Sequence, residues 1–282
     1  MESEQQIADE PVECTDRVEK APAIDVHAHV YHEGMPLADT AWHKPSGSAT
    51  VEQFIDLLDH HGVRYAALAA ASLYGDYNDY TLEVLRQHQR LRATVIIQPE
   101  TGLDEMRQMQ ECGVVGVRLQ FRSVTTPPDL GSERYQKFLR NAAELDWHIH
   151  LHDEGERLPA YIPHIEASGV KLVIDHFGRP VKGDGLNSRG FQEVLRAVQR
   201  GNTWVKLSAA FRLESLDAAK QYAAVLLREA GTERLLWGSD WPFAAFEDNM
   251  SYEKALADYY SVVPERELRE AIDQTAMALY FG

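Results

Sequence analysis

Ile24-Asp25-Val26-His27-Ala28-His29 is the stretch of sequence that decides the fold class. Its apolar and polar residues alternate, which is typical of a β-strand because successive side chains point to opposite faces. We expect Asp25, His27 and His29 to share the inner face, while the apolar residues between them pack outward against helices, as in a parallel barrel. Two imidazoles that converge at a strand end predict a functional site. A pair of purely structural histidines is the alternative.

Strand-like and helical patterns alternate along the rest of the chain. The eight expected strands lie at about residues 23–29, 64–72, 92–98, 114–121, 147–152, 170–176, 202–208 and 233–239. Candidate helices between them include 51–61, 103–112, 135–145, 191–200 and 218–230, several of which end at a glycine. Such alternation implies parallel strands with right-handed crossovers, and eight units favour a (β/α)8 barrel over an open doubly wound sheet. No glycine-rich phosphate-binding loop occurs, which argues against the usual nucleotide-binding folds.

Length and composition are those of an ordinary soluble globular protein. The 282 residues are 44% hydrophobic and 26% charged, with a net charge of −16. We expect one barrel domain over residues 21–282 and a disordered or loosely packed arm over residues 1–20. A strongly acidic chain disfavours nucleic acid and anionic membranes, so the expected partner is a small molecule. The sequence leaves open whether the protein forms a homo-oligomer.

The expected compartment is the cytoplasm. No apolar run approaches the ~20 residues that span a bilayer, and the stretch from Met1 to Lys20 is polar and acidic, unlike a signal peptide. Cys14 and Cys112 are too few and too far apart to suggest a disulfide framework.

Candidate chemical groups gather where the expected strands end. Strand 1 ends in His27 and His29, and strand 8 ends in Gly-Ser-Asp240-Trp-Pro. Strand 5 carries His148, His150 and His152 on its inward face, and strand 6 ends in Asp-His176-Phe-Gly-Arg179-Pro. Because active sites of such barrels lie at the C-terminal ends of the strands, these four ends should form one cluster.

Three of these motifs carry a resemblance to a known family. The sequences DVHAH at 25–29, IDHFGRP at 174–180 and WGSDWP at 237–242 resemble the amidohydrolase superfamily, over residues 23–282 or so. More narrowly they resemble the branch with 2-pyrone-4,6-dicarboxylate hydrolases and sugar lactonases. Further matches are Ser72-Leu73-Tyr74-Gly75 with Asn78, Gly116-Val117-Arg118 with Phe121, and Lys206 followed by Arg212. Two departures stand out: His152 replaces a tyrosine, and Arg122 is only a nearby substitute for a second strand-4 arginine.

The departure at His152 bears on the choice of cofactor. A hydrolytic zinc takes three or four nitrogen and oxygen ligands and leaves a position for water. His27, His29, His152 and Asp240 would suffice for one Zn²⁺ or Mn²⁺. The similar pyrone-dicarboxylate hydrolases work without metal, so metal-independent catalysis is the alternative. Strand 4 offers no lysine to bridge two metals, and we expect no binuclear centre.

The resemblance also implies roles for the clustered residues. Asp240 is the candidate general base that activates water, and His27, His29 and His176 would stabilise the oxyanion. Asp240 could instead serve ordinary turn chemistry. We expect Asp25 to be buried and to hold the tautomer of a histidine.

Four arginines near strand ends indicate an anionic substrate, because guanidinium groups bind carboxylates in bidentate fashion. The expected substrate-binding residues are Arg118, Arg122, Arg179, Arg212, Ser72, Tyr74, Trp42 and Trp241, with His43 beside Trp42. Pairing of these arginines with acidic residues of the rim is the alternative. The long connection 30–49 follows a strand end and could form a lid over the mouth.

We therefore predict a (β/α)8 hydrolase that opens the lactone of a small carboxylated ring such as a pyrone, a muconolactone or a sugar-acid lactone. The alternatives are a metal-dependent decarboxylase of an aromatic or muconate-type acid, a lactone isomerase, and a barrel that binds a ligand without turnover.

Overall fold

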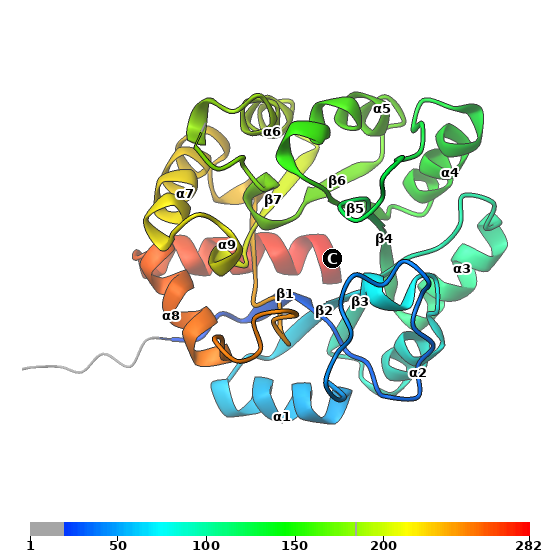
Figure 1. Ribbon diagram of the computed structural model, residues 1–282, viewed down its shortest axis with the longest axis horizontal. Helices are drawn as coiled ribbons and strands as arrows, with labels where there is room; N and C mark the ends of the chain where they lie inside the picture. The colour runs from blue at the N-terminus through cyan, green and yellow to red at the C-terminus, as the bar shows by residue number, and fades with distance from the viewer. Residues whose placement is uncertain (1–19, 184) are drawn as a thin grey trace, which may run out of the picture.

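A computed structural model describes residues 20–183 and 185–282, so nearly all of the expected N-terminal arm lies outside the described residues. Eight strands form one parallel sheet in the order β1 to β8 (Figure 1). They are β1 Ile24–Ala28, β2 Tyr65–Ala69, β3 Leu91–Val95, β4 Val114–Gln120, β5 His148–His152, β6 Lys171–Ile174, β7 Thr203–Ser208 and β8 Leu235–Gly238. The (β/α)8 barrel expected from the alternation is confirmed.

Nine α-helices and six short 3₁₀ helices connect the strands within the described ranges. The α-helices are α1 Val51–His61, α2 Asp79–Gln87, α3 Leu103–Cys112, α4 Glu133–Glu144, α5 Ile162–Ala167, α6 Arg189–Gln199, α7 Leu216–Ala230, α8 Tyr252–Val262 and α9 Arg266–Phe281. Helix α1 begins at a capping box of Thr50 and Gln53 and ends at Gly62, which adopts the left-handed conformation. None of the described helices combines the length and the apolar content needed to cross a bilayer.

The barrel closes between β1 and the segment that follows β8. The backbone N–H of Asp240 donates to His27 O at 2.7 Å, and the N–H of His29 donates to Trp241 O at 2.8 Å. Gly238 makes this approach possible, because a Cβ there would lie 2.4 Å from the Cβ of His27. The same closure brings the strand-1 histidines next to Asp240.

The face of β1 changes along the strand, and this corrects the expected alternation. The pairing of β1 with β2 shifts register between Asp25 and Ala28, so one extra residue is accommodated in β1. Before the shift, Ile24 and Val26 pack inside the barrel with Leu236. After it, His27 also points inward, although it directly follows Val26. The expectation that Asp25 shares a face with His27 was wrong, because a bulge reverses the side-chain parity between them.

Helix α9 covers the end of the barrel opposite the site, where it passes behind the strands (Figure 1). Its residues Ala276 and Tyr280 pack on Ile24, Val26 and Val173. Tyr280 also contacts the ring of His148 at 4.9 Å between centroids, and burial lowers the pKa of His148 to about 3. His148 thus faces inward as expected, but its ring is neutral at pH 7 and lies at the end of the barrel that α9 covers.

Candidate active site

A cleft opens at the C-terminal ends of the strands. It is lined by His29, Tyr31, Trp42, Ala71, Ser72, Leu73, Arg118, Gln120, Arg122, His152, His176, Arg179, Arg212, Asp240, Pro242 and Ala244. The lining combines four guanidinium groups, three imidazoles and one carboxylate. Such a convergence of ionisable groups in a concave site is the usual signature of an active site.

Asp240 occupies the centre of this cluster. Its Oδ1 lies 3.4 Å from Nε2 of His27, 3.5 Å from Nε2 of His29 and 3.9 Å from Nε2 of His176. Its Oδ2 accepts a hydrogen bond from Nε of Arg212 at 2.7 Å. Burial alone would raise the pKa of Asp240, but the charge of Arg212 leads the interactions that outweigh burial and hold this pKa well below its usual range. The carboxylate is therefore ionised at neutral pH.

The backbone of Asp240 is held in an uncommon conformation, with a φ of 68°. His176 and Arg179 also have positive φ values, of 50° and 44°. Non-glycine residues in the left-handed region cost free energy and concentrate at functional sites. The turns after β6 and β8 thus place side chains at the mouth at some cost to stability.

The second nitrogen of each of these three imidazoles faces a different polar group. His29 donates its Nδ1–H to the carbonyl oxygen of Ala69 at 2.6 Å, and Nδ1 of His176 lies 2.8 Å from Ser208 Oγ. Nδ1 of His27 lies 3.1 Å from Asp175 Oδ1. Burial lowers the pKa of His176 to about 4 and that of His27 well below its usual range, so both rings are neutral at pH 7.

This arrangement leaves imidazole lone pairs opposite a carboxylate. Because a carbonyl only accepts, the proton of a neutral His29 must sit on Nδ1, and its Nε2 lone pair then faces Asp240 Oδ1. His27 has a carboxylate at both nitrogens but only one proton when neutral, and neither nitrogen makes a hydrogen bond. A divalent cation would resolve both conflicts, so the residues present fit a metal ion. His27, His176 and Asp240 are the compact group, with ligand atoms all within 4.8 Å of one another.

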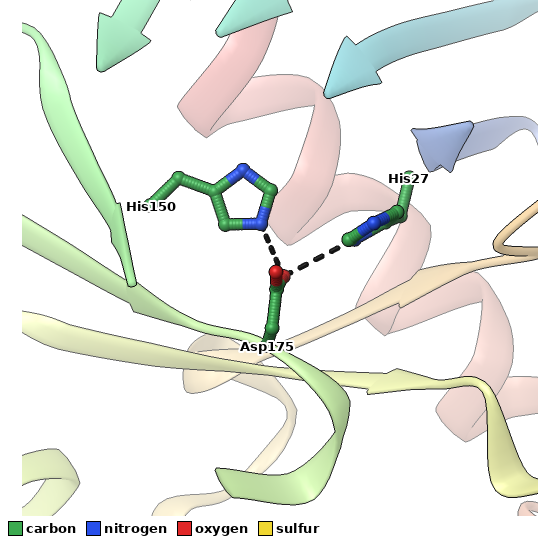
Figure 2. A group of neighbouring side chains, drawn as sticks. All are labelled: His27, His150 and Asp175. Atoms are coloured by element: carbon green, nitrogen blue, oxygen red, sulfur yellow. Dashed lines mark hydrogen bonds and ion pairs between the residues drawn. The ribbon is translucent and has the colours of Figure 1, made fainter. Parts of the chain in front are cut away.

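A second buried carboxylate, Asp175, lies beneath this group, and the sequence reasoning missed it. Asp175 bonds Nε2 of His150 and faces Nδ1 of His27, as Figure 2 shows. It also accepts from Arg118 at 3.2 Å, and Lys206 Nζ lies 3.9 Å away. Burial would raise the pKa of Asp175, but the electrostatic interactions with His150 and His27 and the hydrogen bond with His150 outweigh burial and hold the pKa well below its usual range.

Asp175 takes the role that was expected of Asp25. The carboxylate of Asp25 accepts the backbone N–H groups of His27 and Ser239 at 3.0 Å each, and the hydroxyl of Tyr252 at 3.1 Å. Asp25 is buried as expected, but it holds β1, the segment after β8 and helix α8 together. The tautomer assignment was wrong because the bulge turns Asp25 out of the barrel.

His152 differs from the other imidazoles in the direction of its proton. A guanidinium nitrogen of Arg118 lies 3.5 Å from Nδ1 of His152, and a guanidinium only donates. The proton of the neutral ring therefore sits on Nε2, which is buried without a hydrogen-bond partner and belongs to a residue that lines the cleft. His152 presents a free donor to whatever binds there.

The expected metal set does not form one compact group. The rings follow one another as His29, His27, His176 and His152, with centroid separations of 5.0, 4.7 and 4.9 Å. His29 and His152 therefore lie at opposite ends of the row. His152 groups instead with Asp175 and His176.

The four arginines differ in how much of each guanidinium is free. Arg122 donates to Glu154 at 2.7 Å, which is the rim pairing that was weighed as the alternative. Arg118 is buried and donates to Ala70 O at 2.8 Å as well as to Asp175. Among the residues that the structure describes, the side chain of Arg179 has one long contact, 3.6 Å from NH2 to Glu154, and its buried Nε has no partner. Arg179 is therefore the arginine most available to a ligand.

Some expected binding residues lie outside the cleft. Trp241 stacks on Phe54 at 5.1 Å, and Tyr74 is buried against Tyr31 at 5.4 Å. His43 pairs with Glu247 at 2.8 Å. Both aromatic residues follow a strand end as predicted, but the turns direct their rings into packing layers. Trp42 and Ser72 do line the cleft, as does Tyr31, which the sequence did not single out.

The sequence profile of the amidohydrolase family matches residues 24–281. The chain belongs to this family. The 4-sulfomuconolactone hydrolase of Hydrogenophaga intermedia is 26% identical over 230 residues, which cover 79% of this chain and 76% of the relative. The 2-pyrone-4,6-dicarboxylate hydrolase of Comamonas testosteroni is 27% identical over 270 residues, which cover 89% and 87%.

A solved structure gives the same assignment. It is named a probable 2-pyrone-4,6-dicarboxylic acid hydrolase from Acinetobacter baumannii with citric acid bound. It superposes on this chain with a TM-score of 0.88 at 30% identity, covering 92% of this amidohydrolase and 99% of the other chain. The resemblance drawn from the three strand-end motifs is confirmed.

Proposed function

We propose that this amidohydrolase opens the lactone ring of a small carboxylated cyclic compound by adding water to its carbonyl group. One observation carries the proposal: Asp240 Oδ1 faces three imidazole nitrogens while Arg212 holds Oδ2, at the base of a cleft lined by arginines. The 4-sulfomuconolactone hydrolase and the pyrone-dicarboxylate hydrolase at 26% and 27% identity are named for the same kind of reaction.

Asp240 acts as the general base in this proposal. Arg212 fixes Oδ2, so Oδ1 is the oxygen that takes a proton from the attacking water. The tetrahedral intermediate then collapses as the bond from the carbonyl carbon to the ring oxygen breaks. Asp240 returns the proton to that oxygen, which becomes a hydroxyl group, and the carboxylic acid formed at the carbonyl carbon releases the second proton of the water to solvent and becomes a carboxylate.

The oxyanion of the intermediate needs donors that are already in place. The free Nε2–H of His152 supplies one, because Arg118 fixes its tautomer and burial keeps water from competing. Arg179 supplies a charged donor for a substrate carboxylate, since its Nε is unpaired. His176 is held by Ser208 beside Asp240 and positions the water.

A divalent ion is compatible with these residues. His27, His176 and Asp240 would hold it, with His29 facing the same carboxylate oxygen. When bound, such an ion supplies Lewis-acid polarisation and lowers the pKa of a bound water. His152 would remain a hydrogen-bond donor and not a ligand, because its Nδ1 accepts from Arg118 and its Nε2 carries the proton.

A small anionic substrate and a cytoplasmic location complete the proposal. The arginines are concentrated in one cleft of a chain with a net charge of −16, which focuses a positive site for carboxylates. Cys112 has no disulfide partner within the described part of the chain, which suits a reducing compartment.

The proposal is tested by following acid release from a panel of carboxylated lactones in a pH-stat, with mass spectrometry of the products. Ring opening adds one water and releases one acid equivalent. Release of CO₂ would indicate a decarboxylase instead, and an unchanged mass with altered retention would indicate a lactone isomerase. Parallel assays after dialysis against a chelator, with metal analysis of the protein, decide whether an ion takes part.

A further inference from the structure

A second cavity adjoins the catalytic cleft on the β3 and β4 side of the barrel. The volume open to the centres of water molecules is about 320 Å³ in this cavity and about 40 Å³ in the catalytic cleft. Since a volume of this kind holds one water per ~10–15 Å³, the cleft has room for a few waters or for the reacting group of a substrate. The larger volume next to it is therefore where the bulk of a substrate finds room.

The two cavities share part of their walls. Trp42, Ser72, Arg118 and Gln120 line both of them. The indole N–H of Trp42 donates to Ser72 Oγ at 3.4 Å, so these two residues meet at the shared boundary. Within the described residues, the side-chain amide of Gln120 has no hydrogen-bond partner. A ligand in the cleft can extend past this amide into the second cavity.

Beyond this boundary the second cavity has one continuous set of apolar residues, together with the uncharged polar residues Thr40, Gln98 and Ser123. Its apolar lining comprises Ile96, Ile97, Pro99, Leu119, Phe121, Val124, Pro128 and Tyr135, and we call it the side pocket. Among the described residues that line it, Arg118 alone is charged, and its two terminal guanidinium nitrogens already donate to Ala70 O and Asp175. Only its Nε is unpaired, so a carboxylate placed beyond Arg118 among the apolar residues of the side pocket would have no cation to pair with, which is unfavourable.

We infer that the side pocket is a specificity site for an uncharged apolar substituent, so that the substrate is a lactone with one carboxylate and an alkyl or aryl group. The inference rests on the proposed function for the reaction at the cleft. Arg179 and His152 would take the polar end of the molecule, while the substituent passes Gln120 into the side pocket. The residues at the end of β4 would thus determine whether the site accepts a substrate with a second acid group or one with an apolar substituent.

Binding measurements test this inference without relying on turnover. The probes are 2-pyrone-6-carboxylate and its methyl and propyl derivatives at ring carbon 3 or 4, with 2-pyrone-4,6-dicarboxylate as the charged comparison. Dissociation constants are measured by calorimetry with the Asp240→Asn variant, and kcat/KM with the wild type. In one positional series each added carbon should improve binding and kcat/KM about fourfold, which corresponds to ~0.8 kcal/mol per buried methylene.

Filling the side pocket should abolish this gain. In Val124→Phe, and separately in Ile97→Phe, the ratio of propyl to unsubstituted probe should fall from about 60-fold to near one. Leu57→Phe adds the same bulk beside a different surface pocket and should keep the wild-type ratio. The ratio is taken within each protein, so partial loss of folded enzyme cancels.

Two results would overturn the inference. One is a flat affinity across both alkyl series, and the other is tighter binding of the dicarboxylate than of the propyl compounds. Failure of the proposed function gives a different result, in which no lactone is hydrolysed whatever its substituent. The dissociation constants would still decide what the side pocket accepts.

Discussion

Replacement of Gly238 by alanine should damage the fold and the site together. A Cβ at this position would lie 2.4 Å from the Cβ of His27 and 2.6 Å from its backbone nitrogen. Ordinary contacts begin near 3.4 Å, so β1 and β8 would have to separate by roughly 1 Å. The two closure hydrogen bonds beside it, at 2.7 and 2.8 Å, would stretch or break.

The expected loss follows from these two bonds. Each contributes about 0.5–1.5 kcal/mol, so we expect Gly238→Ala to lower the free energy of unfolding by ~1–3 kcal/mol. The same movement displaces His27 relative to Asp240, and a shift of ~1 Å in a catalytic group can cost about 100-fold in kcat. Urea unfolding and steady-state kinetics measure the two effects.

Gly47→Ala is the matched control, because no atom lies within 4 Å of a Cβ built at Gly47. It should leave both measurements close to wild type. Gly238→Ala with wild-type stability and kcat would refute the reasoning, since it would mean that the closure does not depend on this close approach.

Three further predictions concern charge. Replacing Arg179 by Met should lower kcat/KM for a carboxylated lactone by about 10- to 150-fold, corresponding to ~1.5–3 kcal/mol, but much less for its methyl ester; equal losses would make Arg179 structural. The substitution Arg212→Met should raise the pKa of Asp240 and so move the acid limb of the kcat/KM profile to higher pH. Arg212→Lys keeps the positive charge and should move this limb less. If the limb does not move in Arg212→Met, Asp240 is not the group that produces it. Burial raises the pKa of Asp273 from 3.8 to about 6, so the contribution of Asp273 to the free energy of unfolding should fall as pH rises between these values. Asp273→Asn, which still accepts the Ala23 N–H, should gain stability over wild type as the pH rises, and a pH-independent difference in urea unfolding would contradict this.

The barrel could be predicted from the sequence because its signals are local. Apolar runs of strand length alternate with helical patterns, and helices α1 and α3 have the predicted bounds. Other helix starts differ by two residues, as at Glu133 instead of 135, since a polar first turn outside the apolar stripe carries little signal. The cluster of His27, His29, His176 and Asp240 followed from one rule, that strand C-termini meet at one end of the barrel.

The rest depends on contacts between segments that sequence alone does not register. Alternation in β1 predicted one face for Asp25 and His27, but a single inserted residue reverses it, and an alternating pattern does not mark a bulge. Asp175 stood within a recognised motif, yet its role comes from His150 and Arg118 on other strands. Trp241 illustrates the same limit, because the turn after β8 directs its ring to α1.

The central claim is that Asp240 is the base in lactone hydrolysis, and its most direct test is to measure acid release and product mass with a carboxylated lactone. The wild type and Asp240→Asn are compared after both have been shown to be folded to the same extent. The account predicts one acid equivalent and one added water per turnover for the wild type, and a rate about 10²- to 10⁴-fold lower for the variant. Turnover of the variant within threefold of wild type would contradict the assignment of Asp240 as the base.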